Sequence, residues 1–121
     1  MSTGESLDRC AAYVAARDAL AAIRRAAPAR PASLAQPACE AARRAVVATA
    51  ESMAYDVASP GRRRCARDAL EAALQLAASC DVALAMGFAD DVSDAQREAS
   101  RAVAMLGLFL HANTRQWPEE D

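Results

Sequence analysis

The sequence is poor in the residues that build β-sheets and reactive sites. Aromatic residues make up 4% of the 121 positions, and there is a single histidine. Strands favour aromatic and β-branched side chains, so their scarcity argues against a sheet. Alanine supplies most of a hydrophobic share of 54%, and alanine is the strongest helix former. The composition therefore predicts an all-α protein, and the length suits one domain spanning residues 1–121.

Signals of catalysis and of metal binding are also missing. The one histidine, His111, has no acidic residue at the spacing of a catalytic dyad, and no nucleotide-binding or nucleophile-elbow motif occurs. The four cysteines include no C-x-x-C pair, and the Glu-x-x-His pairs of di-iron bundles do not occur. We therefore expect no enzyme, no metal site and no cofactor. Asp81 is interpreted as a satisfied polar residue on the inner side of its helix.

Membrane and export signals are absent from the sequence as well. No apolar run approaches 18 residues, and the first residues lack the basic and then apolar pattern of a signal peptide. We expect a cytoplasmic protein with no membrane partner. In that reducing compartment the cysteines are interpreted as small buried residues, with a disulfide or a thiol ligand as the alternative.

Apolar residues that recur at intervals of three, four and seven predict four helices, at about 6–27, 34–57, 62–86 and 93–114. Pro60-Gly61 is expected to form the turn between the second and third helices, and Gly87 to follow the third. Helices of similar length with short connections favour an antiparallel up-down-up-down four-helix bundle. The expected N-caps are Ser6, Ser33, and Ser93 or Asp91, with Pro37 in a first turn.

The larger apolar residues are expected on the buried faces. In the first helix this stripe is Leu7, Cys10, Tyr13, Val14, Leu20 and Ile23, and in the third it is Leu70, Ala73 or Leu74, Ala77, Cys80 or Asp81, and Leu84. The fourth helix carries more apolar surface than one buried face needs, because 102–110 is apolar on nearly every side. We predict that Met105, Leu108 and Phe109 meet another copy of the chain; the alternative is an apolar surface without a partner.

Charge gathers locally although the formal net charge is only −2 and every basic residue is an arginine. Four arginines stand in the first turns of the third helix, where the helix dipole disfavours cations. One interpretation is a contact with an anion or a nucleic acid, made by these arginines and by free backbone N–H groups. The others are a solvated turn pairing with Asp68 and Glu71, or a contact with carboxylates of a neighbouring subunit. The candidate residues are Arg62, Arg63, Arg64 and Arg67, with Arg43 and Arg44 added; at the other end of the bundle we expect Arg24, Arg25, Arg30, Arg43 and Arg44 to face Asp90, Asp91 and Asp94.

Several short motifs along residues 7–112 resemble a bacterial four-helix-bundle family. Residues 13–24 resemble its aromatic, Ala-Arg-Asp-Leu, Ile stretch, and Arg43-Arg44-Ala45, Gly61-Arg62-Arg63 and Met105-Leu106 resemble later family elements. The family contains proteins encoded in intervening sequences of large ribosomal RNA genes and the accessory variability proteins of diversity-generating retroelements. Residues 52–56 depart from it, since only Ala54 matches the family's Asn-Ile-Ala-Glu-Gly turn.

The resemblance implies a bundle that assembles into rings, a homopentamer in characterised relatives. For the retroelement branch it also implies binding to a reverse transcriptase and to nucleic acid. Together with the residue patterns, it leads us to expect a non-enzymatic, self-associating scaffold or adaptor for protein partners. The alternative is an accessory nucleic-acid-binding protein that uses the arginines of the third helix. A third hypothesis is a bundle that binds a small ligand in gaps left by small side chains.

Overall fold

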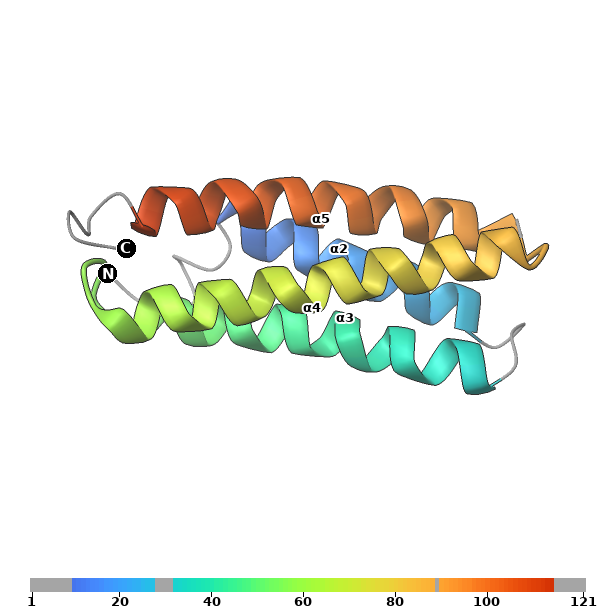
Figure 1. Ribbon diagram of the computed structural model, residues 1–121, viewed down its shortest axis with the longest axis horizontal. Coiled ribbons are helices and arrows are strands. Elements are labelled where there is room, and N and C mark those ends of the chain that lie inside the picture. The colour runs from blue at the N-terminus through green and yellow to red at the C-terminus, as the bar shows by residue number, and fades with distance from the viewer. Residues whose placement is uncertain (1–9, 28–31, 89, 115–121) are drawn as a thin grey trace.

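The computed structural model describes residues 10–27, 32–88 and 90–114, and these form helices and connections without a strand. The helices are α2 (Ala11–Ala26), α3 (Ala32–Met53), α4 (Pro60–Ala85) and α5 (Asp90–Thr114). They lie side by side and alternate in direction (Figure 1). Each helix packs mainly against two neighbours, in the order α2, α3, α4, α5 and back to α2. The predicted all-α, antiparallel up-down-up-down bundle is confirmed.

None of these helices, over the residues that are described, combines the length and hydropathy that a bilayer crossing requires.

The connection between α3 and α4 differs from the prediction. α3 ends at Met53 and not near residue 57, and the backbone then tightens, with N–H groups of Ala54 and Tyr55 donating to carbonyls three residues earlier. α4 already begins at Pro60, so Pro60-Gly61 is the first turn of a helix and not the turn between helices. Ser59 explains this start, because its Oγ accepts a hydrogen bond from the backbone N–H of Arg62 at 3.2 Å. Pro60 fits the first helical position, where its missing N–H costs nothing.

The other helix ends follow the sequence signals more loosely. Gly87 follows α4 with φ +97°, as a residue after a helix C-terminus should. Ser33 and Ser93 lie inside helices that begin earlier, at Ala32 and Asp90, since a capping motif marks where a helix can begin and not where it must. Pro37 lies beyond the first turn of α3, on its exposed side, where water can reach the carbonyl that proline leaves without a donor. The expected N-cap Ser6 lies outside the described residues; Asp91, the other candidate cap of the last helix, is a helical residue.

The core consists almost entirely of alanine. The largest fully buried side chains are Leu76, Leu106, Val92, Thr49, Cys80 and Ser52. In α2 the buried face is formed by alanines and Ile23, whereas Tyr13, Val14 and Leu20 are only half-buried. The expected stripe of larger residues is therefore wrong for most of this helix. A short side chain fills the space between close helices, and longer ones then fit only along the seams at the edge of the core.

The same shift corrects the third helix of the prediction, α4. Ala69, Ala73 and Leu76 are buried, but Leu74 is 50% exposed and Asp81 is exposed as well. The prediction offered Ala73 or Leu74 and Cys80 or Asp81, and in each pair the first residue is the buried one. Leu70, Ala77 and Leu84 lie one position further along the helix than the buried line and are half-buried. Two buried polar groups are satisfied by backbone carbonyls. Thr49 Oγ1 donates to the carbonyl of Ala45 at 2.7 Å, and Ser52 Oγ donates across to Arg62 at 2.6 Å.

Candidate functional site

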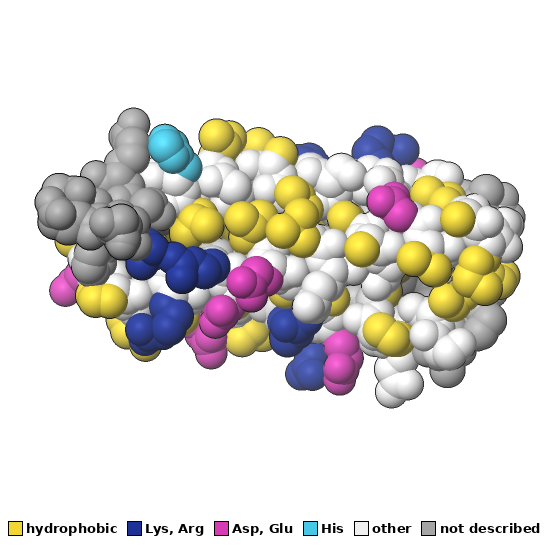
Figure 2. Space-filling model, in the orientation of Figure 1, with side chains coloured by type: hydrophobic (Ala, Val, Ile, Leu, Met, Phe, Trp, Pro, Cys, Tyr) yellow, Lys and Arg dark blue, Asp and Glu magenta, His cyan; other side chains and the backbone are white. Residues whose placement is uncertain are grey.

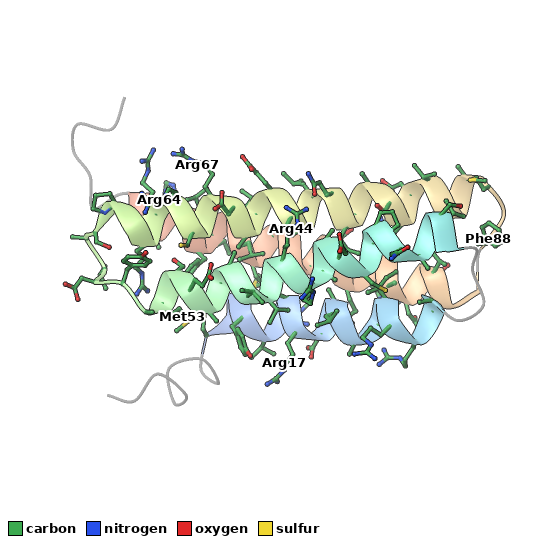
Figure 3. All side chains as sticks on the ribbon, turned by 90° about the horizontal axis from the view of Figure 1, so that it is seen from below. Arg17, Arg44, Met53, Arg64, Arg67 and Phe88 are labelled. Carbon is green, nitrogen blue, oxygen red and sulfur yellow. The ribbon has the colours of Figure 1, made fainter. Side chains whose placement is uncertain are left out.

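The four arginines at the start of α4 do not form one cluster. Successive helical residues are turned by about 100°, so adjacent side chains point to different sides. Arg62 and Arg63 are half-buried, whereas Arg64 and Arg67 are exposed. Figure 3 shows Arg64 and Arg67 pointing away from the bundle from the first turns of α4. Among the four arginines at the start of α4, these two are therefore the ones whose side chains can meet an external anion directly.

Arg62 is engaged within the fold. Its guanidinium lies 5.5 Å from the ring centroid of Phe109 in α5, and its Nη1 donates to the carbonyl of Tyr55 at 3.2 Å. Its backbone N–H bonds to Ser59, and its carbonyl accepts the hydrogen bond of Ser52. A cation stacked on an aromatic face is stabilised there by the ring quadrupole. Arg62 therefore links the α3–α4 connection to the last turns of α5.

The ring of Tyr55 packs against Gly61 at this end of the bundle. A Cβ placed on Gly61 would lie 2.4 Å from Cε1 of Tyr55, closer than any real contact of this kind. The ring thus rests directly on the backbone of α4, and only glycine leaves room for it. This contact could not be predicted from the residue order, in which the Pro-Gly pair indicated only a turn.

Arg43 and Arg44 lie apart from the start of α4. They stand near the middle of α3, and Arg44 Nη2 donates to Oε1 of Gln75 halfway along α4 (Figure 3). Both line an open groove of about 330 Å³ between the two helices. Carboxylates share this groove, so its charge is mixed and not that of a phosphate site. The remaining lining residues are Val47, Ala48, Glu51, Asp68 and Glu71.

The cluster expected at the opposite end is described only in part. Arg24 and Arg43 line a second groove, together with Glu40. Asp94 pairs with Arg97 of its own helix at 2.5 Å. Arg30 and the side chains of Asp90 and Asp91 lie outside the described residues.

The predicted interface residues of α5 divide into two kinds. Leu108 is 64% exposed, whereas Met105 and Phe109 are half-buried and pack against the core. A Cβ added to Gly107 would meet nothing within 4 Å. The surface of α5 is therefore open at Gly107 and apolar at Leu108. Figure 2 shows hydrophobic side chains distributed along α4 and α5.

Two exposed polar contacts fix the register of α5 against its neighbours. Asp81 of α4 accepts a hydrogen bond from Nε2 of Gln96 at 3.0 Å. Arg101 bonds to Asp18 of α2 at 3.1 Å and to Glu98 at 3.2 Å, and these hydrogen bonds raise the pKa of Arg101. Exposed pairs of this kind stabilise a fold only slightly. Asp81 is thus a surface residue, and the expectation that it lies on the inner side is wrong.

Two of the thiols, those of Cys65 and Cys80, are poorly suited to chemistry. All four cysteines are unpaired. Burial raises the pKa of Cys80 to about 11, with a further contribution from Asp81, and burial together with Glu51 raises the pKa of Cys65. A thiol that resists ionisation is a weak nucleophile. His111 is exposed on α5, and the described ranges contain no group of three His, Cys, Asp or Glu side chains that could hold a metal ion.

No family model matches this chain, and no curated protein or solved structure matches it significantly. The resemblance to the intervening-sequence and accessory variability proteins therefore stays a hypothesis based on the motifs given above.

Proposed function

We propose that this protein is a non-catalytic, self-associating helical bundle that serves as a scaffold or adaptor for protein partners. One observation carries the proposal: Leu108 is 64% exposed on α5, next to Gly107, where an added Cβ would meet no described atom within 4 Å. Leu74 on α4 is a second exposed leucine, at 50%. Fully burying a leucine side chain is worth about 1.5–3 kcal/mol, so covering both in each of two copies supplies a useful part of a binding energy.

The test is the molar mass in solution, measured by light scattering after size exclusion at micromolar concentration. We expect a multiple of the 12.7 kDa chain mass. Leu108→Glu should lower that mass, because a carboxylate would be buried without a partner. Val47→Glu is the matched control, since Val47 is a 47% exposed apolar residue on α3. A monodisperse monomer for the wild type contradicts the proposal.

The family resemblance suggests a specific form of this function. A relative of the intervening-sequence proteins would form a ring of five chains, and a relative of the accessory variability proteins would also bind a reverse transcriptase. We place the protein in the cytoplasm, where unpaired cysteines such as these four stay reduced. A measured mass of five chains, or co-purification with a reverse transcriptase encoded nearby, supports this form; any other stoichiometry counts against it.

Contact with RNA or DNA through the start of α4 is the alternative, and the outward direction of Arg64 and Arg67 favours it (Figure 3). In a symmetric assembly this pair would repeat, which multiplies a weak contact. The test is a salt-dependent shift of RNA or DNA that Arg64→Ser combined with Arg67→Ser abolishes. Arg62 is not substituted, because its contacts with Phe109 and Tyr55 help to hold the fold together. Arg25→Ser, an exposed arginine in the last turn of α2, is the control.

A further inference from the structure

α4 carries two parallel lines of residues with alternating intervals of three and four, the spacing of a coiled-coil seam. The inner line is buried in the core, and it consists of Ala66, Ala69, Ala73, Leu76, Cys80 and Ala83. The outer line lies one residue further along, and it consists of Arg67, Leu70, Leu74, Ala77, Asp81 and Leu84. Leu70, Ala77 and Leu84 are half-buried against the core. Leu74, Arg67 and Asp81 are exposed, so the centre and both charged positions of this outer seam face outward.

The outer seam has opposite charges at equal distances from its centre. Leu74 is the midpoint, because Arg67 precedes it by seven residues (74 − 67) and Asp81 follows it by seven (81 − 74). Seven residues are nearly two helical turns, so all three side chains share one face, with each charge about 10 Å from the leucine. On this face of the molecule, Figure 2 shows arginine side chains at one end of the hydrophobic band and an acidic side chain toward the other.

We propose that a second copy of this chain packs on the outer seam, with the two α4 helices antiparallel about a two-fold axis at Leu74. In this arrangement the leucines of the two copies meet at the centre. Arg67 of each copy lies against Asp81 of the other, so one pattern is used twice, as an isologous interface requires. A parallel arrangement would instead set like charges side by side. The inference rests on the proposed function, since it needs self-association.

The neighbouring helix leaves space for this approach. Gln96 lies opposite Asp81 in the antiparallel pair α4–α5. Counting eleven residues from each (96 + 11 and 81 − 11) places Gly107 level with Leu70. Ala104, which is exposed, lies in the preceding turn of α5, between Gly107 and the level of Leu74. The leucine ridge of α4 is therefore flanked by small residues, and the ridge of a second copy can settle beside it.

Charge exchange tests the two-fold axis. Arg67→Glu sets acidic residues against Asp81 of the other copy, and Asp81→Arg sets arginines against Arg67. We expect each single variant to weaken the dimer at least about tenfold, measured as a dissociation constant by sedimentation. A mixture of the two variants should restore association, because both contacts of the mixed dimer then join opposite charges. The chain carrying both substitutions should associate by itself for the same reason.

Two further variants separate this contact from general effects of charge. Arg64→Glu reverses an exposed arginine of the same helix outside the seam, and we expect an unchanged dissociation constant. Leu74→Cys should form a disulfide between copies on oxidation, far faster than the wild type or than Val82→Cys. Val82 is 51% exposed but lines the opposite, α3-facing side of α4. Circular dichroism confirms that each variant is folded.

The outcomes distinguish this inference from the proposed function. A monomeric wild type overturns both. A wild type that associates, but whose mixed and doubly substituted variants do not recover, overturns the two-fold contact and leaves self-association standing. A ring of five chains whose assembly is unchanged by Arg67→Glu and by Asp81→Arg also overturns the two-fold contact and leaves self-association standing.

Discussion

Replacing Gly107 by alanine should stabilise the isolated chain. Gly107 lies inside α5 without a positive φ, so an alanine can adopt its backbone conformation. The new Cβ would meet no atom within 4 Å, so packing gives no penalty. Glycine in a helix interior is about 0.8–1.0 kcal/mol less favourable than alanine, chiefly because the unfolded glycine has more freedom to lose.

We therefore expect a gain of about 1 kcal/mol in the free energy of unfolding. For a chain of this length, that corresponds to a rise of about 3–5 °C in melting temperature. The assay is thermal and urea unfolding followed by circular dichroism at a protein concentration low enough to keep the chain monomeric. Low concentration matters because the α4–α5 face is also the proposed interface, where an added methyl group would oppose association.

The same substitution at Gly61 is the matched control and should have the opposite sign. There the Cβ would lie 2.4 Å from the ring of Tyr55, which would have to leave the backbone of α4. We expect a loss of about 1–3 kcal/mol, the usual cost of overpacking. If Gly107→Ala lowers the melting temperature of the monomer, or if both glycines respond alike, the assignment of Gly107 to an open helix surface is refuted.

Three further predictions concern the core and its ends. Leu76→Ala should cost about 3 kcal/mol in urea unfolding, because Leu76 is 1% exposed and has mainly alanines around it; a cost under 1 kcal/mol would show that the core collapses around the gap. Stability should fall by about 2–3 kcal/mol between pH 9 and 11: below pH 9 both states keep the Cys80 proton, and above it the unfolded thiol ionises while the folded pKa is about 11. Cys80→Ala should lose most of this fall, leaving the part due to Cys65, whose pKa is also raised; an identical pH profile in that variant would exclude Cys80 as its source. Ser59→Ala should cost about 1 kcal/mol through loss of the cap on Arg62, and Ser59→Asp should retain most of the stability.

The sequence predicts those features of the site that depend only on the order of neighbouring residues. The arginines at the start of α4 and the excess apolar surface of α5 are visible in the residue order. The direction of each side chain could not be predicted from the residue order. Arg62 turns toward Phe109 and Tyr55, while Arg64 and Arg67 point away from the bundle. That outcome depends on contacts between residues up to 47 positions apart (109 − 62), which no local pattern contains. Residue spacing left Ala73 or Leu74 open as the buried position of this helix, because both fit a stripe with intervals of three and four.

Residue order alone predicts that the chain forms four helices, that one of them ends near Gly87, and that the helices pack in alternating directions. Helix propensity and short connections are local properties, and alanine, proline and glycine signal them directly. Which face of each helix lies inward depends instead on the packing between the helices. With two adjacent apolar lines on α4, periodicity allows either one to be buried. Close packing against α3 and α5 buries the inner line, which consists mainly of alanines, and leaves the line through Arg67, Leu74 and Asp81 at the surface.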